Sequence, residues 1–383
     1  MIVFLSNYFN HHQRQLSDAL FTLTKGNYRF IQTMQMEQER QTLGWGEKNI
    51  PNYVLISYKN PVVYDKCMEL INNAEVVIAG SYPRHMLKER TRSGRIIFHY
   101  SERPLKNGIG FWGYVLRLCA WRILHTHLYS QNIYLLCASA YTAGDYHKFL
   151  MYRNRCYKWG YFPFTNQYTN IKNLIQHKKE MSLLWAGRLI DWKHPEYAIE
   201  VARRLKADNY KFKLNIIGTG DLENTLRQEI DRFNLDDCVK MLGAMSPENV
   251  RKHMEQSEIY LFTSDFKEGW GAVLNEAMNS GCACVASHAI GSVPFLLKHE
   301  VNGLIYKNGD MDDLYHNVKM LMNDSAKRVQ LGEMAYKTIS ELWNAEIAAE
   351  RFLKLCQGIL SENPTNFKDG PCSRAEIIKD NWM

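Results

Sequence analysis

Short apolar runs recur along the whole chain, with segments of helical character between them. In the first half these runs are Ile2–Leu5, Tyr53–Ser57, Val76–Ala79, Ile96–Phe98 and Ile133–Cys137. In the second half they are Leu183–Ala186, Leu214–Ile217, Val239–Leu242, Ile259–Phe262, Cys284–Ser287 and Leu304–Tyr306. Such runs, without polar alternation, are typical of strands buried on both faces in parallel sheets. Alternation of strands and helices therefore predicts two doubly wound α/β domains.

Helix start signals support this interpretation. Pro195 is the first residue of a helical segment that runs to Lys206, and Ser246 followed by Pro247 combines a cap with a proline start. Asp310 or Asp312 is expected to cap a helix that runs toward Asn323. A last helix is predicted from about Asn344 to Leu360, before a polar tail.

Polar residues at 165–170 interrupt the pattern and place a domain boundary there. The predicted divisions are an N-terminal Rossmann-like domain at 1–170, a C-terminal Rossmann-like domain at 171–345, and a C-terminal helix and tail at 346–383 that crosses back to the first domain. Ligands of such folds bind at the carboxyl ends of the strands, so a cleft between two facing domains is expected to hold the site.

Length and charge agree with two domains of different character. The chain has 383 residues, more than the roughly 250–300 at which single cores stop growing. Residues 1–175 carry 21 Lys and Arg against 10 Asp and Glu, whereas the remainder carries 26 against 30. The basic half indicates an anionic partner, such as membrane phospholipid or a lipid pyrophosphate. No zinc-finger, basic-zipper or RNA-recognition signature supports nucleic acid.

Several function classes are excluded by missing motifs. No apolar run approaches the roughly 18 residues of a membrane span, and Ile2–Leu5 is too short for a signal-peptide core, so a cytoplasmic protein is expected. Nine scattered cysteines without a CxxC pair indicate neither disulfides nor zinc. A GxGxxG fingerprint and a P-loop are also missing, which argues against a nicotinamide dehydrogenase and a P-loop ATPase.

The segment from Glu268 to Glu276 carries the strongest chemical signal. It follows the strand Ile259–Phe262 and opens a helix, and Gly269 and Gly271 let backbone N–H groups approach a ligand. The N-terminus of a helix suits a pyrophosphate, and the two carboxylates suit a ligand rich in hydroxyl groups. The alternative is a strand–loop–helix turn with incidental acids.

A second element follows the strand Leu183–Ala186. Arg188 and Lys193 leave the carboxyl end of this strand together, and they form a complementary pair for a diphosphate. Two solvated loop cations are the alternative. Gly218 and Gly220 follow the strand Leu214–Ile217 and would let the backbone approach a nucleotide, although a glycine pair in a turn is equally compatible.

Taken in order, these motifs resemble the retaining glycosyltransferases of family 4, which have the GT-B fold. The resemblance covers about Met181 to Tyr306 and rests on Gly187-Arg188-Leu189 with Lys193, Gly218-Thr219-Gly220, Glu268-x7-Glu276, Gly291-Ser292-Val293-Pro294 and Gly303-Leu304-Ile305. The stretches at 4–12 and 158–162 look like enzymes of bacterial surface-polysaccharide assembly. Two departures stand out: Trp270 replaces a usual Phe and is expected to reshape the sugar pocket, and a Gly-Gly pair after the first strand is missing.

The resemblance implies a role for each motif. Arg188 and Lys193 would bind the donor diphosphate, Glu268 the transferred sugar, and Glu276 the ribose. The remaining donor contacts would come from backbone at Gly187, Gly218, Gly220, Gly269, Trp270, Gly271, Val273 and Leu274. His99, after the strand Ile96–Phe98, would lie near the reacting sugar, unless it is a structural histidine at a strand end.

The same resemblance implies a metal-independent enzyme without a resident cofactor. Its donor would be a nucleotide-sugar, UDP more often than GDP, and its acceptor a saccharide or polyprenyl-pyrophosphate-linked saccharide bound by the domain at 1–170. Asp310-Met311-Asp312 reads as a DxD motif, but its place before a helix favours capping. An epimerase of the same fold, or a non-catalytic sugar-nucleotide-binding protein, are the alternatives.

A membrane surface is a further possible partner. The segment at 108–122 combines Trp, Tyr and Arg, which is typical of interfacial helices. Basic residues precede it at Lys88, Arg90, Arg92, Arg95, Arg103 and Lys106. A partly buried helix with solvated arginines is the alternative.

Overall fold

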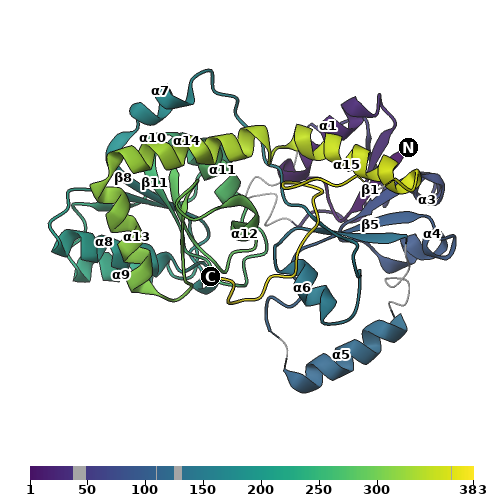
Figure 1. Cartoon of the computed structure of the whole chain (residues 1–383), viewed down its shortest axis with the longest axis horizontal. Coiled ribbons are helices and arrows are strands. Elements are labelled where there is room, and N and C mark those ends of the chain that lie inside the picture. The colour runs from purple at the N-terminus through teal and green to yellow at the C-terminus, as the bar shows by residue number, and fades with distance from the viewer. Residues whose placement is uncertain (38–48, 109, 125–131, 364) are drawn as a thin grey trace. The chain divides into compact units, whose positions relative to one another are not determined.

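The structure is a computed structural model that describes residues 1–37, 49–108, 110–124, 132–363 and 365–383 (Figure 1). The chain divides into two compact units. Unit 1 consists of Met1–Phe164 and Asn344–Trp382, and unit 2 of Thr165–Trp343. The predicted divisions after 170 and 345 therefore lie close to the observed ones, and the C-terminal segment belongs to unit 1.

Unit 1 contains a parallel sheet whose described strands follow the order β3-β2-β1-β4-β5-β6-β7. These strands are β1 (Ile2–Ser6), β2 (Tyr28–Gln32), β3 (Val54–Ile56), β4 (Val76–Ala79), β5 (Ile96–Ser101), β6 (Ile133–Cys137) and β7 (Cys156–Lys158). Ala79 at the end of β4 pairs in register with His99 on β5. The sequence did not predict β2 and β7.

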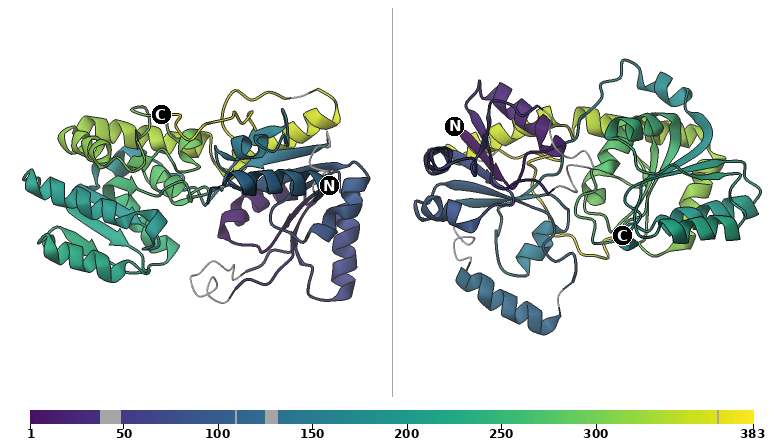
Figure 2. Two further views of the ribbon diagram at one scale, coloured as in Figure 1. Left: turned by 90° about the horizontal axis from the view of Figure 1, so that it is seen from below. Right: turned by 180° about the vertical axis from the view of Figure 1, so that it is seen from behind.

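Helices cover both faces of this sheet (Figure 2). They are α1 (His11–Leu23), α3 (Pro61–Asn73), η1 (Arg84–Leu87), α4 (Lys88–Arg92), α5 (Phe111–Leu124), α6 (Thr142–His147) and α15 (Ala345–Leu360). One core joins the sheet to α3 and α6. On the opposite face Phe98 packs edge-on against Phe352 of α15, with ring centroids 5.0 Å apart. α15 lies beside α1 within this unit (Figure 1).

The C-terminal tail is bound along the edge of the same sheet. The amide of Lys158 donates to Ser373 O, and the amide of Ala375 donates to Cys156 O. Farther on, the Trp382 indole donates to the Tyr141 hydroxyl at 2.9 Å. These bonds extend the sheet beyond β7 and fix the tail to unit 1.

Unit 2 contains a second parallel sheet, whose described strands follow the order β10-β9-β8-β11-β12-β13. They are β8 (Lys179–Ala186), β9 (Lys213–Ile217), β10 (Val239–Met241), β11 (Ser257–Phe262), β12 (Ala283–Ser287) and β13 (Leu304–Tyr306). Each overlaps an apolar run predicted from the sequence. The prediction of two doubly wound α/β domains is therefore confirmed.

The helices of unit 2 also lie on both faces of their sheet. They are α7 (Ile171–Gln176), η3 (Asp191–Lys193), α8 (Pro195–Ala207), α9 (Glu223–Arg232), α10 (Pro247–Gln256), α11 (Val273–Asn279), α12 (Val293–Leu296), α13 (Met311–Asn323) and α14 (Ser325–Glu341). α10, α11 and α14 cover one face, while α8, α9 and α13 cover the other (Figure 1). The predicted caps hold: Ser246 accepts from the Asn249 amide, and Asp310 accepts from the Asp313 amide.

None of the described helices is both long and apolar enough to span a bilayer.

Candidate active site

The loops that follow β8, β9 and β11 meet at one edge of the unit 2 sheet, because these three strands are neighbours. The Leu189 amide donates to Thr219 O at 2.9 Å, which joins the first two loops. The Thr263 hydroxyl donates to Lys193 O at 2.8 Å, which joins the first to the third. The predicted motifs at 187–193, 218–220 and 268–271 are therefore brought together.

Two glycines allow the first pair of loops to approach so closely. A Cβ on Gly218 would lie 1.8 Å from Gly187 O, and a Cβ on Gly220 would lie 2.4 Å from Leu189 O. Real Cβ atoms do not approach backbone that closely, so only glycine fits at either position. The structure thus gives these glycines a packing role between loops.

Lys193 and Glu268 form an ion pair at this edge. The ammonium group donates to Oε2 of the carboxylate, and the Ser264 hydroxyl donates to the same oxygen at 3.0 Å. The two side chains retain 13% and 10% of their exposure, so solvent screens the pair only weakly. The Lys193 ammonium also lies 4.8 Å from the centre of the Trp192 ring. Both predicted charges are thus positioned and still open to a ligand.

Arg188 lies beside this pair and is exposed. Its guanidinium is 5.7 Å from the centre of the Trp192 ring. In the part of the chain that the structure describes, it makes no hydrogen bond or ion pair. The five N–H donors of Arg188 are therefore available to an anionic ligand.

The backbone after Glu268 turns sharply at Gly271, where φ is +80° and a Cβ would lie 2.4 Å from the Phe262 ring. α11 starts two residues later. Among the described residues, the amide N–H groups of Gly271, Ala272 and Val273 have no hydrogen-bond acceptor. The turn therefore presents unused donors next to the Lys193–Glu268 pair, as the glycine pattern predicted.

Glu276 lies on α11 close to an arginine that the sequence analysis did not single out. The Arg251 guanidinium, from α10, lies 4.0 Å from the carboxylate and donates to Glu276 O at 3.0 Å. Burial raises the pKa of Glu276, and the charge of Arg251 opposes this shift. No pattern in the sequence could have linked two residues on separate helices.

The expectation for the Trp270 side chain is wrong. Trp270 is fully buried, donates from its indole to Asn275 Oδ1 at 2.9 Å, and packs against Trp343 with ring centroids 5.9 Å apart. The side chain therefore belongs to the core and cannot reshape a sugar pocket. Leu274 is fully buried as well, and its amide donates to Gly271 O, so neither residue presents free surface to a ligand.

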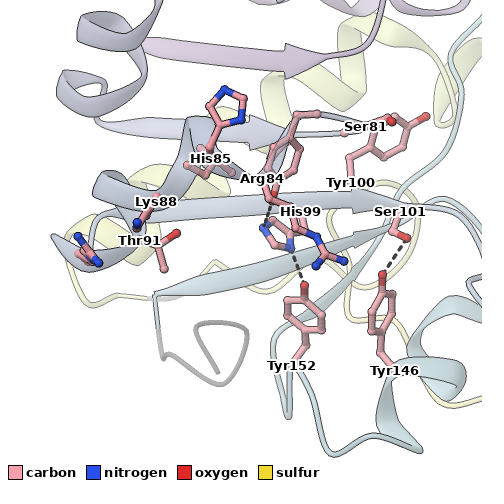
Figure 3. A pocket seen from close by; sticks show the side chains of 15 residues that line it. Ser81, Arg84, His85, Lys88, Thr91, His99, Tyr100, Ser101, Tyr146 and Tyr152 are labelled. Carbon is pink, nitrogen blue, oxygen red and sulfur yellow. Dashed lines mark hydrogen bonds between the residues drawn. The ribbon is translucent and has the colours of Figure 1, made fainter. Parts of the chain in front are cut away.

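His99 lies in the other unit, where it lines a cavity at the ends of β4 and β5 (Figure 3). Its Nδ1 is 2.6 Å from the Tyr152 hydroxyl, and its Nε2 is 3.2 Å from the Tyr82 hydroxyl. Both ring nitrogens are thus engaged. A ligand can therefore bind a ring nitrogen of His99 only if it displaces one of these two tyrosine hydroxyl groups.

The described residues include no group of three His, Cys, Asp or Glu side chains placed to hold a metal ion. Asp310 of the DxD-like sequence caps α13, and Asp312 pairs with Arg204 at 2.6 Å. The capping interpretation is confirmed.

Comparison with known proteins finds a family match for part of the chain and a shared fold for nearly all of it. Residues 167–338 match the family described as glycosyl transferases group 1. The amylovoran biosynthesis glycosyltransferase AmsK of Erwinia amylovora is 30% identical over 193 residues, which make up 49% of this chain and 47% of that protein. An N-acetylgalactosaminyltransferase of Campylobacter jejuni, whose name specifies a diphospho-undecaprenol-linked saccharide, is 30% identical over 150 residues, 39% of this chain and 40% of that protein. The chain thus spans about half the length of these curated relatives or less.

Solved structures resemble nearly the whole chain. HepE of Anabaena in complex with UDP matches with a TM-score of 0.67 and 16% identity, over 94% of this chain and 99% of that chain. The pneumococcal O-GlcNAc transferase GtfA in complex with UDP and GlcNAc matches with the same TM-score and 12% identity, over 94% and 99%. These likenesses confirm the GT-B fold expected from the sequence.

Proposed function

We propose that this chain, whose residues 167–338 match the family described as glycosyl transferases group 1, transfers a sugar from a nucleotide-diphosphate donor, with retention of anomeric configuration. The acceptor is a saccharide or a lipid-linked saccharide in bacterial surface-polysaccharide synthesis. The observation that carries the proposal is the Lys193–Glu268 ion pair, on the same group of loops as the exposed Arg188 and the unused amide donors of Gly271, Ala272 and Val273.

The donor is proposed to lie along the loop edge of unit 2. Arg188 and Lys193 bind the diphosphate, since a planar guanidinium and a compact ammonium complement its two phosphate groups. The amides of Gly271 to Val273 bind the same group. Lys193 has three donors, so it can hold the phosphate while it keeps its bond to Glu268.

The two carboxylates take the hydroxyl groups at either end of the donor. Glu268 accepts from the transferred sugar, and its bonds from Lys193 and Ser264 fix its orientation. Glu276 accepts from the ribose. Support comes from the location of Glu268 beside Lys193 and of Glu276 on the helix that follows the turn.

In the proposed reaction, the bond between the anomeric carbon and the diphosphate oxygen breaks as the acceptor oxygen attacks from the same face. The acceptor hydroxyl gives its proton to the leaving diphosphate, so charge and atoms balance without a protein nucleophile. Arg188 and Lys193 stabilise the negative charge that develops on the leaving group. No metal is required for this role, because two cations and the backbone donors supply it.

UDP is the proposed nucleotide. Two of the structural relatives, HepE and GtfA, were crystallised with UDP. A direct test mixes the protein with UDP-sugars and an undecaprenyl-diphosphate-linked saccharide and measures UDP release and product configuration by NMR. Transfer with retention supports the proposal. Donor conversion without acceptor would favour the epimerase, and binding without conversion would favour the non-catalytic protein.

Membrane association is proposed through α5. The predicted interfacial segment at 108–122 also contains Ile109, which lies outside the described residues. Trp112 and Leu116 lie one helical turn apart, with 75% and 70% of their surface exposed. Figure 1 shows α5 at the margin of unit 1. Of the basic residues noted before it, Arg90 and Arg103 are buried and cannot contact a membrane. Sedimentation with anionic liposomes at low salt tests the proposal, and loss of binding in Trp112→Ala with Leu116→Ala is the expected result.

A further inference from the structure

A cavity of about 580 Å³ lies wholly within unit 1, at the carboxyl ends of β4 and β5 (Figure 3). Residues after β4 and at the end of β5 form one side, η1 and α4 form another, and Tyr146 and Tyr152 close it. Ligands of doubly wound sheets bind at this edge. The volume is within the range of ligand pockets and exceeds what a single phosphate needs.

Three cations line this cavity from η1 and α4. Arg84, Lys88 and Arg92 are spaced four residues apart, which places them along one side of these consecutive helical turns. All three are exposed. Within the described residues, none of the three makes a side-chain hydrogen bond or ion pair, and no Asp or Glu lines the cavity.

A fourth cation, Arg90, lies between Lys88 and Arg92 in α4 and has a structural role. Arg90 is fully buried and donates to four backbone carbonyl groups, including Ile71 O at 2.8 Å and Ala74 O at 2.7 Å. It fixes α4 to the sheet. Arg84, Lys88 and Arg92 have no comparable contacts, so the fold does not use their charge.

Three like charges around one cavity repel each other, and an anion inside the cavity would relieve that repulsion. Phosphate oxygens accept hydrogen bonds from the planar guanidinium groups of two arginines and from the compact ammonium group of a lysine. Their span along η1 and α4 suits two linked phosphates better than one carboxylate.

The opposite side of the cavity offers hydroxyl groups. Tyr82 and Tyr152 flank His99, and Ser101 Oγ lies 3.1 Å from the Tyr146 hydroxyl. Burial raises the pKa of Tyr82, Tyr146 and Tyr152, so these phenols stay protonated and can both donate and accept. This chemistry complements a sugar ring.

We propose that this cavity binds a diphosphate-linked sugar, with the diphosphate on Arg84, Lys88 and Arg92 and the sugar toward His99 and the tyrosines. The inference rests on the proposed function, because the ligand is assigned as the acceptor. It specifies that acceptor as a sugar diphosphate, in contrast to a neutral saccharide.

The test is calorimetric titration with a short-chain prenyl-diphosphate-linked N-acetylglucosamine, in the presence of UDP at a concentration that saturates the donor site. The variant is the triple substitution Arg84→Gln, Lys88→Gln, Arg92→Gln. The control is Lys25→Gln, Lys59→Gln, Lys66→Gln, which removes the same charge from exposed positions of unit 1 outside the cavity. UDP affinity is measured separately for each protein as a check of folding.

The expected result is a Kd at least tenfold higher in the cavity variant, with the control within twofold of wild type and UDP affinity unchanged in both. A twofold change or less in the cavity variant would overturn the inference, as would equal weakening in the control. Wild-type protein that binds UDP but not the probe would also overturn it and leave the donor assignment standing. Failure to bind UDP would count against the proposed function instead.

Two further probes identify the source of the diphosphate. A soluble nucleoside-diphosphate-sugar tests for a free ligand, and N-acetylglucosamine 1-phosphate tests whether one phosphate suffices. Tighter binding of the prenyl-linked probe than of either supports a lipid-linked acceptor. Equal binding of the soluble diphosphate assigns the cavity to a free sugar diphosphate, and equal binding of the monophosphate contradicts the requirement for two phosphates.

Discussion

Lys193 and Glu268 form an ion pair although they are 75 residues apart in the chain. The parallel order β9-β8-β11 causes this meeting, because it places the loops after β8 and β11 at one edge. The pair holds a cation, and the carboxylate that we propose to bind the sugar, in fixed positions before any ligand arrives. Such preorganisation removes part of the ordering cost of binding and of the transition state.

Glu268→Gln is expected to reduce kcat/KM for transfer by roughly tenfold or more, because the amide keeps the shape but loses the charge that sugar hydroxyls and Lys193 use. Affinity for UDP, which lacks the sugar, should change less than threefold. Steady-state kinetics and UDP titration measure the two effects. Glu248→Gln, an exposed carboxylate on α10, is the control. Equal loss of turnover and UDP affinity would contradict the role assigned to Glu268.

Arg188→Ala is expected to cost about 2 kcal/mol or more of transition-state stabilisation, a fall of roughly 30-fold in kcat/KM, since a charge-assisted bond to the leaving diphosphate is lost. Its melting temperature should not change, because Arg188 is exposed and bonds to no other described residue. Arg227→Ala on α9 is the matched control. Near-normal kcat/KM in Arg188→Ala would remove this residue from the site.

Trp270→Phe is expected to lower the free energy of unfolding by about 1–3 kcal/mol, because it leaves space beside Trp343 and removes the bond to Asn275. Donor affinity should stay within threefold. Urea titration and UDP binding measure both quantities. Trp112→Phe, at an exposed position, should change stability by less than about 0.5 kcal/mol. Unchanged stability with altered donor binding would place the Trp270 ring in the site after all.

Gly218→Ala is expected to destabilise unit 2 by at least about 1–3 kcal/mol, because its Cβ would overlap Gly187 O. Separation of the two loops should also weaken UDP binding. Gly243→Ala serves as the comparison: φ is +72° there, but a Cβ would meet nothing within 4 Å. Backbone strain alone should cost about 1 kcal/mol. Equal effects at the two positions would mean that the loops do not depend on close approach.

His194 provides a pH-dependent contribution to stability. Its Nδ1 lies 2.7 Å from Glu196 Oε1, and this bond raises the pKa of His194, with Asp265 nearby adding to the shift. A raised folded-state pKa stabilises the fold fully below the unfolded value of about 6.5 and loses that effect as pH rises through the folded value.

His194→Asn removes the charge and tolerates the left-handed backbone at this position, where φ is 49°. The difference in unfolding free energy between wild type and variant should therefore be larger at pH 5.5 than at pH 8.5. Urea titrations at the two pH values measure it. A difference that grows with pH would show that the ion pair does not act as described.

The sequence predicted the strands of unit 2 because each contains a run of mostly apolar residues, although Asn215 lies within β9 and Lys240 within β10. In unit 1, β2 was missed because Arg29 interrupts its apolar residues. β7 was missed because its only apolar residues, Cys156 and Tyr157, stand between Arg155 and Lys158. Both have partners in the sheet that a local pattern does not show. Whether such segments form strands depends on pairing with neighbouring strands more than on their local composition.

For the site, the spacing of glycines and the charged residues that follow buried strands predicted which loops contain the candidate site residues. The pairing of Lys193 with Glu268 depends on strand order, and the burial of Trp270 depends on Trp343 far along the chain. Lys88 and Arg92 were noted among the basic residues of the first half, whereas the sequence analysis did not single out Arg84. Only the structure separates them from the buried Arg90 and places them in one cavity.

We propose above all that unit 2 binds a nucleotide diphosphate through its own cations and backbone donors. Thermal-shift measurement of the whole chain against UDP, GDP, ADP and their sugar derivatives, with and without magnesium, tests it most directly. At about 100 times its Kd, a ligand of the folded state adds about 2.7 kcal/mol. We expect a magnesium-independent rise in melting temperature with one family of nucleotides, and we expect that family to be UDP and its sugar derivatives. No rise with any nucleotide, from folded protein, would contradict it.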